Sequence, residues 1–123
     1  MTTPLWRSLP LSAALGAPVL LKMEALQPCG SFKLRGVGRL CAAQVAAGAT
    51  RLVCASGGNA GLAVAYAGRR LGVAVAVVVP KTTSARAREL LAAEGAEVVE
   101  HGDDWDAAHR FALAGPARGA TYV

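Results

Sequence analysis

Lys33 stands in a setting that suits a reactive amine. It follows the run Cys29-Gly30-Ser31 and the aromatic Phe32, where a turn gives way to a helical pattern. A lysine that condenses with an aldehyde must be partly desolvated, so that it reacts as the free amine. The ordinary role of a lysine is a solvated charge. Lys33 therefore becomes a candidate nucleophile only if the rest of the chain supplies a matching site.

A glycine-rich turn follows about 25 residues later. Residues 55–61 read ASGGNAG and lie between an expected strand and an expected helix. Unpaired backbone N–H groups at the start of a helix favour an anion, and Ser56 and Asn59 add side-chain donors. A plain helix cap in a tight turn is an equally good interpretation of this segment alone.

Two common nucleotide sites are excluded by their residues. A G-x-G-x-x-G fingerprint would need glycine at positions 56, 58 and 61, and Ser56 breaks it. The G-x-x-x-x-G-K-[ST] phosphate loop is absent too, because Lys81 and Thr82 follow Pro80 without the required glycines.

The elements that must position these residues alternate along the chain. Strands are predicted at residues 18–24, 51–55, 73–79 and 96–100 and from residue 120, from apolar runs. Helices are predicted over 32–47, from the glycines of 55–61 to 71, from about 84 to the stop at Gly95, and over 103–114. Strand starts near 51, 73, 96 and 120 leave room for one crossover helix between parallel strands.

This pattern predicts an α/β fold with a doubly wound, mainly parallel sheet and helices on both faces. Residues 73–79 are apolar on both sides, as a central parallel strand should be. We expect the chain to be the front portion of a longer protein, because it stops on a bare strand.

Composition narrows the function further. Hydrophobic residues make up 54% and charged residues 17%, and the net charge of +5 is scattered rather than gathered in a basic block. We therefore expect no nucleic-acid partner. The longest apolar run is too short to span a membrane and no signal peptide is evident, so a cytoplasmic protein is expected. The odd count of three cysteines without metal spacing predicts free thiols and no metal site.

The lysine segment and the glycine turn together, in this order and spacing, resemble the pyridoxal-phosphate enzymes of the tryptophan-synthase-β fold type (fold type II). Within them the chain is most similar to the serine/threonine dehydratases, including serine dehydratase and its dehydratase-like paralogues. The resemblance covers the whole chain and rests on Thr3-Pro4-Leu5 and on three segments, LKMEALQPCGSFKLRG, SGGNAGLAVAYAGRRLGV and VVVPKTTS.

The resemblance implies a cofactor, pyridoxal 5′-phosphate, and a role for each matching residue. Lys33 would form the Schiff base with the cofactor and Phe32 would stack on its ring. Asn59 would bond the ring hydroxyl. The loop that holds the substrate carboxylate would comprise Ser56, Gly57, Gly58, Asn59 and Ala60.

The implied reaction is β-elimination of L-serine or L-threonine to pyruvate or 2-oxobutyrate plus ammonia. Lys33 would take the Cα proton while the cofactor acts as electron sink. Serine racemase, cysteine synthase or threonine synthase-like activity is the alternative within the fold type. A truncated, inactive fragment is an alternative of another class.

The resemblance also implies an organisation. Residues 1–26 would begin the large cofactor domain and 27–123 would form a small α/β domain, truncated at its C-terminal end, in a homodimer when full length. The family's glycine-rich phosphate loop and cation site come later in its chains, so we expect little activity from these 123 residues alone. Cys29 stands where the family more often has Ser or Thr. His101 and His109 match no family site, and we interpret both as surface residues.

Overall fold

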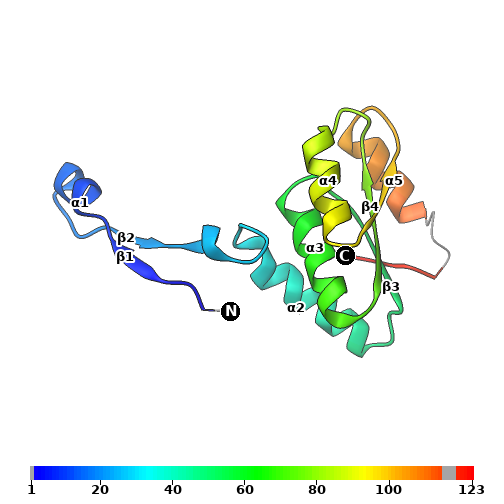
Figure 1. Cartoon of the computed structure of the whole chain (residues 1–123), viewed down its shortest axis with the longest axis horizontal. Helices are drawn as coiled ribbons and strands as arrows, with labels where there is room; N and C mark the ends of the chain where they lie inside the picture. The colour runs from blue at the N-terminus through cyan, green and yellow to red at the C-terminus, as the bar shows by residue number, and fades with distance from the viewer. Residues whose placement is uncertain (1, 115–118) are drawn as a thin grey trace.

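The computed structural model describes residues 2–114 and 119–123. Figure 1 shows a narrow N-terminal arm that projects from a rounded α/β body. Two short strands, β1 (Leu5–Arg7) and β2 (Leu20–Lys22), pair antiparallel in the arm with Leu5 opposite Lys22. The 3-10 turn η1 (Glu24–Leu26) follows, and the long helix α2 (Lys33–Ala46) then leads into the body.

The arm also carries helix α1 (Leu9–Leu15), which the sequence analysis did not predict. Ser8 caps this helix by accepting a hydrogen bond from the Leu11 backbone N–H at 3.4 Å. A proline lies in the first turn, and Gly16 ends the helix with φ 63°. The helix is only seven residues long and buries none of its side chains, so its apolar pattern gave little evidence of it.

The body contains a parallel sheet with strand order β5-β4-β3-β6 within the described residues. Its strands are β3 (Arg51–Ala55), β4 (Ala74–Val79), β5 (Glu97–Glu100) and β6 (Thr121–Tyr122). The connecting helices are α3 (Asn59–Leu71), α4 (Ala85–Ala93) and α5 (Trp105–Ala114). The expected α/β fold with a doubly wound parallel sheet is confirmed.

Side chains alternate between the two faces of the sheet, as the pleat requires. Leu52 and Cys54 of β3 face one cluster, which helices α2, α3 and α4 cover with Cys41, Val64 and Leu91 among others. Val53 and Ala55 face the opposite cluster, which α5 covers with Ala108 and Ala112. The central strand β4 is buried on both faces from Val75 to Val79.

The strand order places a topological switch point between β3 and β6. The chain moves from β3 outward through β4 to β5 and then returns to the opposite side of β3. Open α/β sheets bind ligands outside the carboxyl ends of their strands at such a point. The loop that follows β3 therefore lies at the position where a ligand is expected.

Candidate active site

The loop after β3 forms a short turn into a helix. β3 ends at Ala55, α3 begins at Asn59, and Gly58 is the N-cap residue with extended φ −112° and ψ −152°. No side chain of the described residues caps this helix end. Inside the loop, the Gly58 N–H donates to Ser56 Oγ at 3.3 Å. The first-turn N–H groups of α3 thus remain available to an anion.

Two glycines allow close packing of the loop and of the start of α3. A Cβ atom on Gly57 would lie 2.8 Å from Cγ2 of Thr83. On Gly61 it would lie 1.9 Å from the Ser56 carbonyl oxygen, so any side chain at that position would push the loop away from the helix. Gly57 was a predicted site residue. Gly61 was not predicted, because its importance comes from its close contact with the Ser56 carbonyl oxygen.

Lys33 is the first residue of α2, and its backbone N–H donates to Ser31 Oγ at 3.3 Å. Its amine lies 5.7 Å from the centroid of the Phe32 ring. Both side chains are exposed, with Phe32 at 61%. The partial desolvation expected for a reactive lysine is therefore not provided by the described residues.

Two hollows connect Lys33 with the loop. Phe32, Lys33 and Val37 line a hollow of about 400 Å³ along α2. Val37 also lines a second hollow of about 270 Å³, together with Ser56 and Ala60. Lys33 and Val37 are four residues apart and lie on one face of α2. Val37, on that face, is the residue that lines both hollows.

The remaining predicted loop residues lie outside both hollows. Gly58 and Asn59 are exposed at the start of α3, and Gly57 is half-buried near Thr83. The structure thus groups Phe32 with Lys33 and Ser56 with Ala60, with Val37 between the two groups.

An aromatic group that was not predicted from the sequence lies beside the loop. Trp105, at the start of α5, donates from Nε1 to the Ala55 carbonyl oxygen at 2.7 Å. Its ring stacks on His109 at 4.6 Å, and His109 Nδ1 lies 2.8 Å from the Tyr122 hydroxyl. Trp105 and Tyr122 both line the hollow that contains Ser56. The spacing of four residues between Trp105 and His109 was the available signal.

His109 corrects an expectation, because it is half-buried between Trp105 and Tyr122 rather than a surface residue. His101 is exposed, as expected, and stacks on Phe111 at 3.8 Å.

The cysteines are free thiols, as expected. Burial raises the pKa of Cys54 to about 12, and the nearby Cys41 adds to this shift. Burial also raises the pKa of Cys29, which is half-buried. Since the thiolate is the reactive form, these surroundings disfavour a nucleophilic role for either cysteine.

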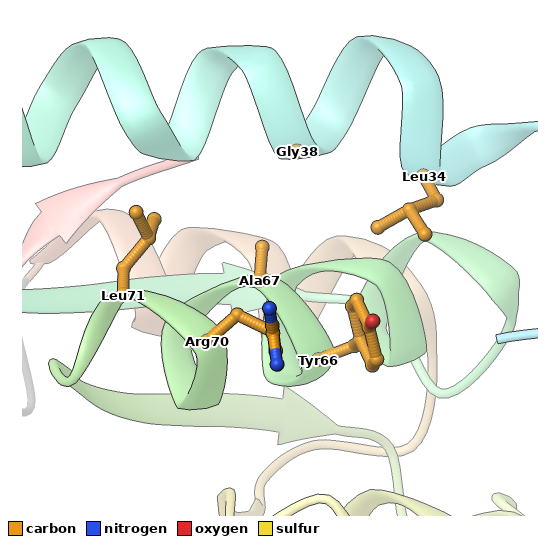
Figure 2. A pocket seen from close by; sticks show the side chains of 6 residues that line it. All are labelled: Leu34, Gly38, Tyr66, Ala67, Arg70 and Leu71. Carbon is orange, nitrogen blue, oxygen red and sulfur yellow. The ribbon is translucent and has the colours of Figure 1, made fainter. Parts of the chain in front are cut away.

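Another hollow of about 270 Å³ lies between α2 and α3 (Figure 2). Apolar side chains dominate it, with one phenol and one guanidinium; the residues are Leu34, Gly38, Tyr66, Ala67, Arg70 and Leu71. None of the predicted site residues lines it, and we interpret it as a packing groove between the helices.

Within residues 2–114 and 119–123, no group of three or more His, Cys, Asp or Glu side chains is placed to hold a metal ion. Over the same residues, no helix is both long and apolar enough to cross a membrane.

Comparisons with known proteins agree with this geometry. The model of the family described as "Pyridoxal-phosphate dependent enzyme" matches residues 1–123. The human protein "Serine dehydratase-like" is 49% identical over 109 residues, which are 89% of this chain and 33% of that protein. The mouse "L-serine dehydratase/L-threonine deaminase" is 49% identical over 112 residues, which are 91% of this chain and 34% of that protein.

A solved structure extends the likeness to the fold. The processed form of threonine deaminase isoform 2 from Solanum lycopersicum superposes with a TM-score of 0.92 at 32% identity, over 100% of this chain and 34% of that one. The chain thus spans about a third of the length of the curated relatives it matches. The expected resemblance is confirmed, and since the family match runs through the lysine segment and the switch-point loop alike, the chain belongs to the pyridoxal-phosphate-dependent enzyme family.

Proposed function

We propose that the protein catalyses β-elimination of L-serine and L-threonine, giving pyruvate or 2-oxobutyrate and ammonia. The names of the human and mouse relatives support this reaction. The observation that carries the proposal is the placement of Lys33 and Ser56 on either side of Val37, at the carboxyl edge of the sheet.

The described residues fit pyridoxal 5′-phosphate, the cofactor of the family. When bound, it supplies an aldehyde that condenses with amines and a conjugated ring that takes up the electron pair left at Cα. The exposed Lys33 amine is free to reach an aldehyde from the hollow it lines with Phe32. In this proposal Lys33 would bond the cofactor, Phe32 would cover one ring face and Asn59 would donate to the ring hydroxyl.

The loop after β3 would hold the substrate by its carboxylate. The free N–H groups in the first turn of α3 and the positive end of the helix dipole both favour a negative charge. In this proposal Ser56, Gly57, Gly58, Asn59 and Ala60 would form the wall of this site. Because Gly61 fixes how far the loop lies from the helix, the carboxylate would be held in one place.

Lys33 would also move the proton. With the cofactor and substrate bound, Lys33 Nζ would accept the Cα proton of the substrate. The β-hydroxyl would leave with one proton as water, so that the elimination balances, and addition of water to the released enamine would yield the oxo acid and ammonia. This step needs a desolvated amine, so further protein surface has to cover Lys33.

The arm supports a two-domain arrangement. Its apolar side chains are exposed, including Leu5 at 57%, Trp6 at 54% and Leu20 at 55%. An isolated two-stranded hairpin is marginally stable in water, so the arm needs a partner surface. We propose that residues 1–26 belong to the large cofactor domain and that residues 27–123 belong to the small α/β domain. A homodimer in the cytoplasm completes the proposal.

Product analysis of the protein as made from its own gene tests this function. Incubation with pyridoxal phosphate and L-serine, without added nucleophile, should release pyruvate and ammonia in equal amounts, and L-threonine should release 2-oxobutyrate. Release of D-serine would instead indicate a racemase. A requirement for an added thiol or sulfide would indicate a β-replacement enzyme, and no turnover at all would favour an inactive fragment.

A further inference from the structure

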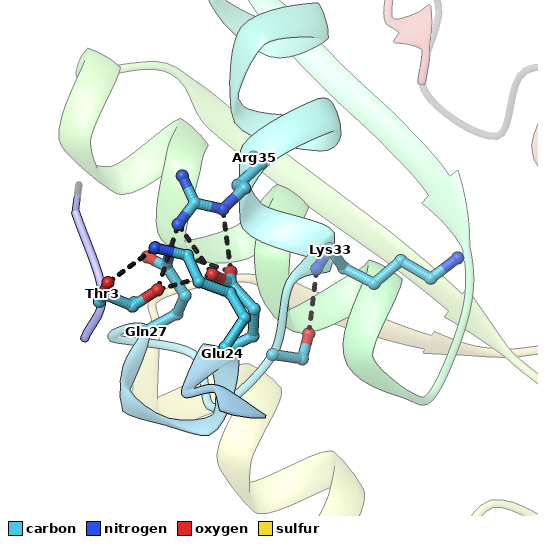
Figure 3. A network of polar contacts seen from close by, with 7 residues as sticks. Thr3, Glu24, Gln27, Lys33 and Arg35 are labelled. Carbon is cyan, nitrogen blue, oxygen red and sulfur yellow. Dashed lines mark hydrogen bonds and ion pairs between the residues drawn. The ribbon is translucent and has the colours of Figure 1, made fainter. Parts of the chain in front are cut away.

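A dense polar cluster joins the N-terminal arm to the first turn of α2 (Figure 3). Arg35 donates from Nε to Glu24 Oε2 at 2.8 Å and from Nη2 to Glu24 Oε1 at 2.7 Å. Thr3 Oγ1 donates to Glu24 Oε1 at 2.6 Å and accepts from Arg35 Nη2 at 3.2 Å. Gln27 Nε2 donates to Glu24 Oε2 at 3.1 Å, and Lys22 Nζ donates to the Thr3 carbonyl oxygen at 2.6 Å.

This cluster is more buried than an ordinary salt bridge on the protein surface. Thr3 and Gln27 are each only 4% exposed, and the side chain of Glu24 is 18% exposed. A two-pronged bond between a guanidinium and a carboxylate is among the stronger and more directional polar contacts in proteins. The hydrogen bond to Arg35 is the largest cause that lowers the pKa of Glu24 to about 2, so this carboxylate is ionised at neutral pH.

The cluster acts on the same helical turn that carries the candidate nucleophile. Arg35 follows Lys33 by two residues, which turns its side chain by about 200° around the helix axis, and both residues contribute to the lining of the hollow along α2. Figure 3 shows the Lys33 side chain extending away from the cluster. Ser31 Oγ accepts from the Lys33 N–H within this segment, and the Arg35 contacts join the same helix start to Glu24 and Thr3.

We propose that the Glu24–Arg35 pair, bridged by Thr3, is a positioning device for Lys33. It fixes the start of α2 against the arm and thereby fixes the direction in which the Lys33 amine points. This inference rests on the proposed function of Lys33. None of the cluster residues is assigned a chemical step.

The body provides a matched control pair. Arg69 donates from Nε and Nη2 to Glu94 Oε2 at 3.0 and 2.8 Å, joining α3 to the end of α4. The side-chain exposures are 51% and 22%, against 44% and 18% for Arg35 and Glu24. Arg69 lies at the far end of α3 from its loop, so its loss should affect stability without redirecting Lys33.

The test measures how fast pyridoxal phosphate attaches to Lys33 in the protein as made from its own gene. Absorbance follows the attachment, and borohydride reduction with peptide mass spectrometry identifies the lysine. Arg35→Lys keeps the positive charge but loses the two-pronged bond to Glu24. We therefore expect the rate of cofactor attachment to fall by roughly tenfold or more, and we expect a larger change in kcat than in KM. Arg69→Lys should leave the attachment rate within about twofold.

Three further variants can contradict the inference. Thr3→Val removes the bridging hydroxyl and leaves both charges in place, and should slow attachment by about threefold even if Arg35→Lys does not fold. Glu24→Gln and Arg35→Gln should combine non-additively if the pair acts as a unit. Unchanged attachment rates in the cluster variants, or equal slowing in Arg69→Lys, would overturn the positioning role while leaving the proposed function intact. A wild-type adduct on another lysine would overturn both.

Discussion

A Cβ atom on Gly61 would lie 1.9 Å from the carbonyl oxygen of Ser56 and 3.2 Å from Cγ1 of Val77. The first of these neighbours is backbone, which cannot rotate aside as the end of a side chain can. The loop can lie this close to α3 only because Gly61 has no side chain. The position in which the loop would hold a carboxylate therefore depends on Gly61.

We predict that Gly61→Ala destabilises the protein by about 1–3 kcal/mol and raises KM for L-serine, because the loop or the helix must shift. Urea unfolding and steady-state kinetics measure the two effects. Gly36→Ala is the stability control, since a Cβ there meets nothing within 4 Å. As a change within a helix it should stabilise by up to about 1 kcal/mol. Equal effects of the two substitutions on stability would argue against the close approach.

Trp105 offers a second test of the loop. Trp105→Phe keeps an aromatic ring against His109 but removes the 2.7 Å hydrogen bond to the Ala55 carbonyl oxygen. We expect a loss of about 1 kcal/mol in the free energy of unfolding and a higher KM, because Ala55 leads directly into Ser56. Trp6→Phe, on the arm, should leave KM unchanged. A KM that responds equally to both substitutions would count against the role of Trp105.

The Glu24–Arg35 pair predicts a dependence of stability on pH. The pKa of Glu24 is lowered from 4.5 to about 2 in the folded protein, chiefly by hydrogen bonding to Arg35. A carboxyl with a depressed pKa stabilises the fold above its unfolded pKa, and this contribution is lost as pH falls toward the folded pKa. The difference in unfolding free energy between wild type and Glu24→Gln should therefore shrink as pH falls from 4.5 to 2. A constant difference over this range would contradict the pairing.

Asn59 carries the next prediction, at the start of α3. Asn59→Ala should weaken the binding of the cofactor and the binding of the substrate by roughly 1–3 kcal/mol each, because a hydrogen bond to each is lost. A cofactor titration followed by absorbance and a KM measurement check this. Gln44→Ala removes a side-chain amide from α2, away from the loop, and should leave both constants unchanged. An unchanged cofactor spectrum and KM in Asn59→Ala would remove Asn59 from the site.

Most of the body could be predicted because its signals are local. The apolar run at 73–79 indicated a strand buried on both faces, and β4 lies between β3 and β5. The second helix was predicted to end at residue 71 and the third at Gly95, and the glycines at these ends, Gly72 and Gly95, adopt positive φ of 72° and 85°. The helix predicted from about residue 84 is α4, and Ser84 caps it by accepting from the Ala87 N–H at 3.2 Å.

The features that could not be predicted depend on contacts between distant segments. The strand order puts β6 beside β3, and only this order places Tyr122 next to the Ser56 loop. Trp105 reaches Ala55, fifty residues away, through a side-chain donor that no local pattern indicates. The exposure of the Lys33 side chain likewise could not be predicted from its neighbours Gly30 and Phe32, because burial of a side chain depends on which distant segments pack over it.

The most direct measurement is the identity of the lysine that bonds the cofactor. Of the lysines in the chain, Lys22 and Lys81 donate to oxygens of Thr3 and Asp103, at 2.6 and 3.2 Å. The protein as made from its own gene should be incubated with pyridoxal phosphate, reduced with borohydride, digested and analysed by mass spectrometry. The adduct should lie on Lys33, and Lys33→Ala should lose it together with nearly all turnover. An adduct on a different lysine, or turnover that survives Lys33→Ala, would contradict the account.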